Sequence, residues 1–268
     1  MDKRNASNLR RLAGDLLAPV EYWLDNIGKI VGLTGRTVLW LVRPPFRFGR
    51  VLDAMDFIGV QSIFIVALTG TFSGMVLALQ MSHALRTFNA EGRVGGIVAI
   101  SLARELAPVF SAIMVTARAG SAMAAELGNM RVTEQIDAIT TMGVSSVQYL
   151  LSPRLLAAVL MVPLLCVLYG TVGLAGAYLV AVHWMGGDPG VFMESVKNFT
   201  APSDIWMGLI KAGVFGFFVS AISCRHGFYA SGGARGVGQA TTRAVVESCV
   251  TLLVVNYLVT QVLLDVGW

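Results

Sequence analysis

Two adjacent ionisable residues interrupt an apolar stretch and are the first candidates for chemistry. Arg104 and Glu105 lie in the segment Ser101-Leu-Ala-Arg-Glu-Leu-Ala-Pro108. If that segment spans a bilayer, each charge at its centre costs about 2.5–3.5 kcal/mol, so each is expected to face a polar cavity or a charged partner. Neighbouring helical positions point about 100° apart. Arg104 and Glu105 therefore need not pair with each other.

Lys211 is a third charge within an apolar stretch, and it could approach Glu105 if the two stretches pack together. Two interpretations stay open. The three charges line a polar substrate cavity, or they form an internal salt bridge that fixes helix packing. Pro108 lacks a backbone donor, so we expect it to kink the helix beside these charges.

A polar segment between residues 118 and 154 is the second candidate. Its stretch Thr133-Glu-Gln-Ile-Asp137 has the composition of a helix start, with Thr133 as the cap and acids in the first turn. We expect a polar amphipathic segment at 126–149, with a short helix that starts at Thr133 on the cytoplasmic side. Such a segment either docks into a groove on another protein or is an ordinary solvated helix.

The sequence offers no set of residues for nucleotide, metal or nucleophilic chemistry. It has no GxxxxGK(S/T) phosphate loop, because the glycine-rich stretch 231–238 lacks the required ending. The histidines lie far apart, without a carboxylate at metal-ligand spacing: His83, His183 and His226. The cysteines have no CxxC spacing and are interpreted as packing residues: Cys166, Cys224 and Cys249. We therefore expect no metal site and no catalytic set in this chain.

Composition indicates the kind of element that must position these residues. Of 268 residues, 55% are hydrophobic and only 13% are charged, against roughly 25% charged in a typical soluble domain. The mean hydropathy is +0.69. These values exclude a soluble enzyme, a disordered chain and a disulfide scaffold, and they predict an all-α polytopic membrane protein.

Charge-free runs predict where the chain crosses the membrane. Residues 57–85 include no Lys, Arg, Asp or Glu over 29 positions, and residues 155–187 include none over 33 positions. A spanning helix needs about 20 apolar residues. Five spans are predicted, at about 57–80, 94–119, 154–182, 205–224 and 244–265. Polar loops are expected at 183–204 and 225–242.

The N-terminal region differs in character from the rest of the chain. Apolar residues recur at helical spacing over 9–24, which indicates an amphipathic helix on a membrane surface. Residues 27–42 are more apolar but contain two cations, so we interpret them as interfacial or re-entrant. The expected organisation is interfacial helices over 1–50 and a membrane domain over 51–268.

The basic residues predict the orientation. With a cytoplasmic N-terminus, fifteen Lys and Arg lie in the inner segments and three in the outer loops. Lys and Arg concentrate on the cytoplasmic side of membrane proteins. The asymmetry therefore favours a cytoplasmic N-terminus and, with five spans, a periplasmic C-terminus.

Several short stretches carry a resemblance that hydropathy does not show. They are Leu102–Pro108, Ala117–Ala122, Ala125–Gly128, Met130–Gln135 and Ala240–Val246. In these stretches the chain resembles the MlaE/YrbE permease family of ABC transporters, which work with MCE-domain proteins in lipid transport. The similarity covers roughly residues 50–265, and the N-terminal 40 residues match only in general character.

The resemblance implies an assembly and a division of roles. It implies a homodimer in the bacterial inner membrane, with phospholipid in a cavity between the two permeases. It also implies a hexameric MCE-domain protein on the periplasmic side, a separate cytoplasmic ATPase that binds ATP and Mg, and room for a STAS-domain accessory subunit. No cofactor and no nucleic acid are expected for this chain.

The resemblance also assigns site residues. The charged positions of the cavity fall on Arg104, Glu105 and Lys211, and the ATPase-coupling helix covers about 126–143. Its expected contact residues are Glu126, Arg131, Glu134, Gln135 and Asp137. The implied role is outer-membrane lipid asymmetry or lipid trafficking. Two other functions remain open from the residues alone, a stand-alone ion-coupled carrier or channel and, more weakly, a membrane-embedded enzyme.

Overall fold

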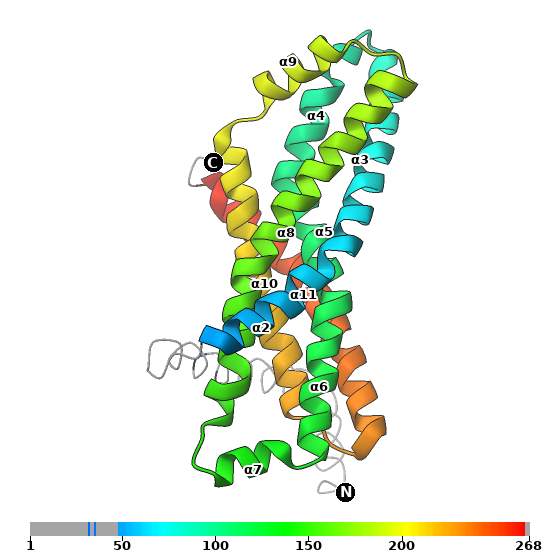
Figure 1. Ribbon diagram of the computed structural model, residues 1–268. Helices are drawn as coiled ribbons and strands as arrows, with labels where there is room; N and C mark the ends of the chain where they lie inside the picture. The colour runs from blue at the N-terminus through cyan, green and yellow to red at the C-terminus, as the bar shows by residue number, and fades with distance from the viewer. Residues whose placement is uncertain (1–31, 33–34, 36–47, 266–268) are drawn as a thin grey trace, which may run out of the picture.

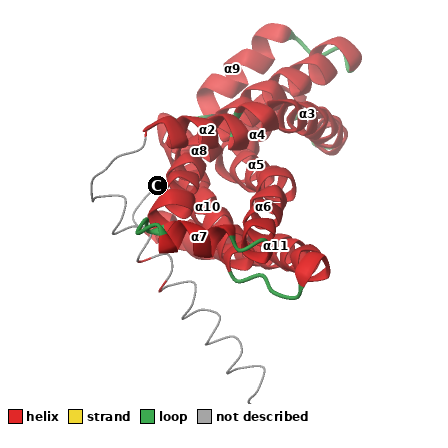
Figure 2. Cartoon of the chain, turned by 60° about the horizontal axis from the view of Figure 1, so that its bottom comes forward, coloured by secondary structure: helices red, strands yellow, loops and turns green. Residues whose placement is uncertain are grey.

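A computed structural model describes residues 32, 35 and 48–265, and within that part every regular element is a helix (Figures 1 and 2). Five helical segments are long and apolar enough to cross a membrane: Phe48–Arg86, Glu91–Val132, Val147–Trp184, Pro202–Phe228 and Gly233–Asp265. The prediction of an all-α polytopic membrane protein with five spans is confirmed. The predicted interfacial helices at 9–24 and 27–42 lie outside the described residues, except for Gly32 and Gly35.

The first span has a break that the charge-free run did not reveal. Helix α2 (Phe48–Ile58) is followed by a short 3-10 turn, Val60–Ser62, and then by α3 (Ile63–Arg86). The predicted span at 57–80 therefore begins in the end of α2, before α3 starts. Arg118 holds this break from the second span, donating to the Phe57 carbonyl at 2.5 Å and to the Ser62 hydroxyl at 3.1 Å.

The second span is one long helix with two changes of register. It runs through a 3-10 turn at Glu91–Arg93, α4 (Val94–Ser101), α5 (Ala107–Val115) and α6 (Ser121–Val132). Two five-residue π-helical segments, Leu102–Leu106 and Thr116–Gly120, join these pieces. The first lies directly before Pro108, whose missing amide hydrogen interrupts the α-helical ladder. The helix continues past the predicted end at residue 119. The prediction stopped there because the last turns of the helix are polar and lie outside the apolar stretch.

The third to fifth spans are also longer than predicted. A π-helical segment at Val147–Leu151 leads into α8 (Ser152–Tyr178), which ends in another at Leu179–Trp184. Helices α10 (Pro202–Phe228) and α11 (Gly233–Asp265) form the fourth and fifth spans. The short α7 (Gln135–Thr141) and α9 (Pro189–Phe199) lie at opposite ends of the molecule (Figure 1).

Two predicted loops are largely helical. The segment 183–204 contains α9, which Asp188 caps by accepting a hydrogen bond from the Val191 amide at 3.0 Å, with Pro189 in the first turn. The segment 225–242 contains the end of α10 and the start of α11. Only residues 229–232 connect them, and Gly232 has a φ of +90° that favours glycine. The loop predicted from the glycine-rich composition was therefore longer than the loop in the structure.

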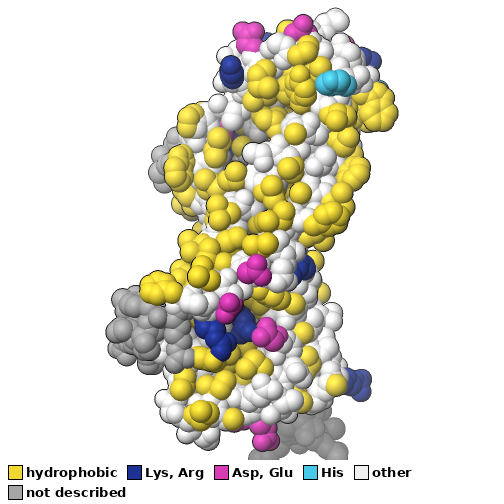
Figure 3. Space-filling model, in the orientation of Figure 1, with side chains coloured by type: hydrophobic (Ala, Val, Ile, Leu, Met, Phe, Trp, Pro, Cys, Tyr) yellow, Lys and Arg dark blue, Asp and Glu magenta, His cyan; other side chains and the backbone are white. Residues whose placement is uncertain are grey.

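Small residues allow the long helices to approach closely. A Cβ at Gly74 of α3 would lie 1.9 Å from the Gly173 carbonyl oxygen of α8, so a larger residue cannot fit there. Close approach through small residues is how helices associate where lipid replaces water. On the face drawn in Figure 3, hydrophobic side chains cover the long helices, while charged ones gather beside α2 and at the two ends. This surface suits a bilayer around the middle of the bundle.

Candidate functional site: an intramembrane ion-pair network

Lys211 of α10 reaches across to the second span, as the sequence predicted. Its Nζ lies 2.6 Å from Glu105 Oε1. The Lys211 side chain is 0% exposed, whereas that of Glu105 is 42% exposed. Because a buried ammonium without a partner is very costly, Glu105 is the group that allows Lys211 to be buried here.

A second acceptor for Lys211 arises from the break at Pro108. Proline has no amide hydrogen, so the Arg104 carbonyl, four residues earlier, receives no α-helical hydrogen bond from it. Lys211 Nζ donates to that carbonyl oxygen at 2.9 Å. Pro108 therefore does more than alter the helix, because it frees an acceptor that the buried lysine uses.

Arg104 points to a different partner from Glu105. Its Nε and Nη2 lie 2.6 and 2.5 Å from Asp204 Oδ1, in the first turn of α10. The other carboxylate oxygen of Asp204 accepts the Ala201 amide at 2.8 Å. Asp204 is 2% exposed and Arg104 is 31% exposed. The expectation that Arg104 and Glu105 need not pair with each other agrees with this arrangement.

Gly208 allows α10 to come this close to the second span. A Cβ at residue 208 would lie 2.3 Å from the Ala103 carbonyl oxygen. Gly208 thus packs against the Ala103 carbonyl, and Lys211 donates to the Arg104 carbonyl. One helical turn before Gly208, Asp204 pairs with the Arg104 side chain.

The fifth span adds two polar groups that sequence reasoning missed. Asn256 Nδ2 donates to Glu105 Oε2 at 3.1 Å, and Thr260 Oγ1 lies 3.5 Å from Glu105 Oε1. Asn256 Oδ1 is buried and has no hydrogen-bond partner among residues 48–265. Their spacing of four residues in the mostly apolar second half of α11 was the available signal, because it places both on one face.

We call these six residues the ion-pair network: Arg104, Glu105, Asp204, Lys211, Asn256 and Thr260. It joins the second, fourth and fifth spans within the membrane-spanning part of the bundle. Arg104 and Glu105 are its partly exposed charged members, so they can meet a polar ligand. Lys211 is fully buried and acts on such a ligand only through Glu105. The two interpretations of these charges, a polar cavity and an internal salt bridge, therefore each fit a different part of the network.

The predicted coupling residues fall on two helices and not on one. Glu126 and Arg131 belong to α6, Glu134 precedes α7, and Gln135 and Asp137 lie in α7. Glu134 has a φ of +59°, which ends the α6 path and starts α7 in a new direction. Glu134, Gln135 and Asp137 are exposed, whereas Ile136 is buried against the bundle.

Ion pairs connect the α7 end of the molecule to the spans. Arg131 Nη1 lies 2.6 Å from Asp137 Oδ1, and Arg154 Nη2 lies 2.8 Å from Glu126 Oε1. Thr133 does not cap α7 as predicted, because its hydroxyl donates to the Asn129 carbonyl at 2.8 Å and so completes α6. No group of three His, Cys, Asp or Glu side chains able to hold a metal ion occurs in the described part of the chain.

Known proteins similar to this chain agree on one family. Residues 51–262 match the family described as Permease MlaE. A probable ABC transporter permease protein of Rickettsia bellii is 42% identical over 90% of this chain and 93% of its own length. The intermembrane phospholipid transport system permease protein MlaE of Haemophilus influenzae is 38% identical over 82% of this chain and 85% of its own.

A chloroplast relative extends the similarity beyond bacteria. Protein TRIGALACTOSYLDIACYLGLYCEROL 1 of Arabidopsis thaliana is 35% identical over 85% of this chain and 65% of its own length. The family match over residues 51–262 includes the ion-pair network and nearly all of the five spans. The chain belongs to the MlaE family of ABC transporter permeases.

Proposed function

We propose that this chain is the membrane subunit of an ATP-driven phospholipid transporter of the bacterial inner membrane, working with a periplasmic MCE-domain protein in lipid asymmetry or lipid trafficking. The observation that carries the proposal is the ion-pair network in mid-membrane, in a chain similar to a phospholipid transport permease. A phospholipid has a charged headgroup and apolar chains. Paired charges beside apolar helices suit both parts of that molecule.

In this proposal Arg104 and Glu105 contact the headgroup, because they are the partly exposed charged members of the network. The Arg104 guanidinium suits the phosphate, since its planar donors match phosphate oxygens. Lys211 is a positioning residue that holds the Glu105 carboxylate. Asn256 and Thr260 hold the same carboxylate from the fifth span.

The ATPase is proposed to be a separate chain that binds ATP and Mg, so this chain needs no cofactor. Its contact is assigned to Glu134, Gln135 and Asp137, which are exposed around the start of α7. Glu126 and Arg131 support that contact from α6. The N-terminus is then cytoplasmic and the C-terminus periplasmic, which puts α7 inside and α9 outside.

A homodimer is proposed because the fifth span is the least covered. Only 17% of its apolar window is buried, against 56% for the fourth span. A second copy against α11 would bring two ion-pair networks toward a shared cavity. The MCE-domain partner is assigned to the outer end, where Trp184 and Trp206 are 74% and 59% exposed.

Reconstitution with a co-purified ATPase tests this function. ATP-dependent transfer of a labelled phospholipid out of vesicles is expected, and Glu105→Gln should reduce it at least about tenfold. Glu91→Gln at the outer end is the matched control, because Glu91 forms only an exposed pair with Arg86. Normal transport by Glu105→Gln contradicts the assigned role. Transport that follows an ion gradient without any ATPase supports the ion-coupled carrier instead.

A further inference from the structure

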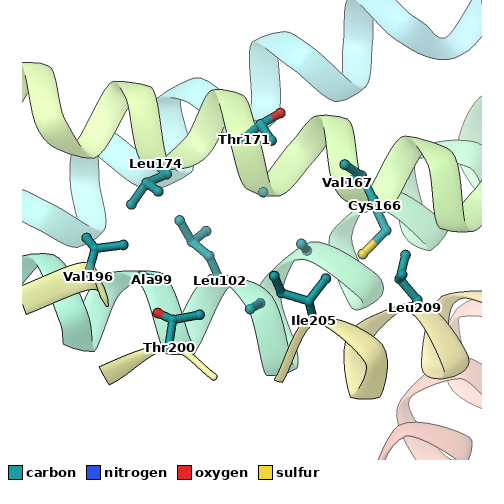
Figure 4. A pocket seen from close by; sticks show the side chains of 13 residues that line it. Ala99, Leu102, Cys166, Val167, Thr171, Leu174, Val196, Thr200, Ile205 and Leu209 are labelled. Carbon is teal, nitrogen blue, oxygen red and sulfur yellow. The ribbon is translucent and has the colours of Figure 1, made fainter. Parts of the chain in front are cut away.

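An apolar groove lies outside the ion-pair network, between helices of this one chain. It has a volume of about 270 Å³. Ala99, Leu102 and Ala107 line it from the second span, and Gly170 and Leu174 line it from α8. Figure 4 shows the side chains of α8 facing those of the second span and α10 across this space.

The groove and the ion-pair network use different faces of the same helices. On α10, Ile205 and Leu209 line the groove, and positions four apart share a helix face. Asp204 and Lys211 lie on another face and belong to the network. The contact of Gly208 with the Ala103 carbonyl separates the two. The groove is thus a second, apolar compartment beside the charged one.

We propose that the groove holds one acyl chain of a phospholipid, apart from the cavity between protomers. This inference rests on the proposed function. The groove lies within the membrane-spanning segments, where acyl chains are the surrounding solvent. Its volume is below the roughly 300–1,000 Å³ of sites for compact ligands, which suits a slender chain.

The outer end of the groove suits the polar part of the same lipid. Thr200 lines that end, between α9 and α10, and its hydroxyl has no hydrogen-bond partner among the described residues. Rotation about its Cα–Cβ bond presents the hydroxyl to an ester oxygen. Asp204, in the first turn of α10, holds the partly exposed Arg104. An acyl chain that leaves the groove here therefore brings its headgroup toward Arg104.

Photolabelling of the full chain in lipid nanodiscs tests this proposal directly. The probe is a phosphatidylethanolamine with a diazirine on one acyl chain, and labelled peptides are mapped by mass spectrometry. We expect labelling around residues 99–107, 166–174 and 205–209 to exceed labelling of the exposed face of α3 at Phe64 and Phe72. The readout needs neither ATP nor transport. Labelling of the groove can therefore be found even if the chain proves not to be a transporter subunit, and it can be absent even if the chain transports phospholipid.

Two glycines provide a matched pair of variants. An added Cβ at Gly170 would have its nearest neighbour at 3.8 Å, and so would one at Gly213, which lies outside the groove. Gly170→Leu fills the groove and should lower its labelling about fivefold or more. Gly213→Leu should leave it unchanged. Ala99→Leu, which narrows the groove from the opposite wall, should act like Gly170→Leu and serves if that variant does not fold.

Three results would overturn the proposal. Labelling no stronger in the groove than at Phe64 and Phe72 of α3 would mean ordinary bilayer contact. Labelling by a diazirine fatty acid but not by the phospholipid would mean a different ligand. Loss of labelling whenever partner subunits co-purify would mean that a protein helix fills the groove.

Discussion

The Lys211–Glu105 and Arg131–Asp137 pairs have the same nitrogen–oxygen distance, 2.6 Å, but different surroundings. Lys211 is 0% exposed, whereas Arg131 and Asp137 are 39% and 57% exposed. Breaking a buried pair leaves an uncompensated charge and costs about 3–5 kcal/mol, while an exposed pair contributes about 0–1 kcal/mol. The nitrogen–oxygen distance alone therefore does not show which pair stabilises the fold and which pair can bind a partner protein without loss of stability.

The largest effect is expected from Glu105→Gln, which leaves the Lys211 ammonium buried without its carboxylate. Unfolding free energy should fall by about 3–5 kcal/mol. Thermal unfolding of the purified chain in detergent measures the loss. The double variant Glu105→Gln with Lys211→Met should recover most of it, because the buried charge is then absent. An unchanged melting temperature in the single variant would break the comparison between buried and exposed pairs.

Asp204→Asn should have an intermediate effect. Asp204 is buried, but its partner Arg104 is partly exposed, so water can solvate the guanidinium that loses its counter-charge. Loss of a hydrogen bond to a charged group costs about 1.5–3 kcal/mol. The same unfolding measurement applies, with Asp188→Asn at the exposed cap of α9 as the control. A loss as large as that of Glu105→Gln would show that exposure of the cation left unpaired, Arg104 in place of Lys211, does not reduce the cost.

The smallest effect on stability is expected from Arg131→Ala. Its pair with Asp137 is exposed on both sides, so unfolding free energy should change by less than about 1 kcal/mol. Under the proposed function, the variant should still lower ATP hydrolysis by the reconstituted complex, because the pair connects α6 to α7. A large fall in melting temperature would contradict the distinction. Unchanged hydrolysis would remove Arg131 from the coupling contact.

How far the sequence predicts the structure depends on the kind of residue. The five spans follow from charge-free runs, and the approach of Lys211 to Glu105 follows from the cost of unpaired charges in a bilayer. The ends of the helices do not follow, because α9 and the start of α11 are polar or glycine-rich. Asp204 was assigned to the end of a loop, although Pro202 before it is typical of a first helical turn.

Other features depend on three-dimensional contacts that no local pattern contains. Asn256 enters the network only because the fifth span packs beside the second. The Thr133 hydroxyl could either complete α6 or cap α7. Its hydrogen bond to the Asn129 carbonyl shows that it completes α6. The left-handed conformation at Glu134 separates α7 from α6, and so leaves Thr133 at the end of α6.

The unbroken backbone of the second span has a mechanical consequence. About 40 Å of helix separates Arg104 from Val132, taking the α-helical rise per residue, with no interruption of the helical chain between them. A twist applied at the Val132 end therefore turns Arg104 and Glu105 together through covalent bonds, without passing through any side-chain contact. Because the two side chains leave the helix in different directions, the same twist moves their charges in different directions.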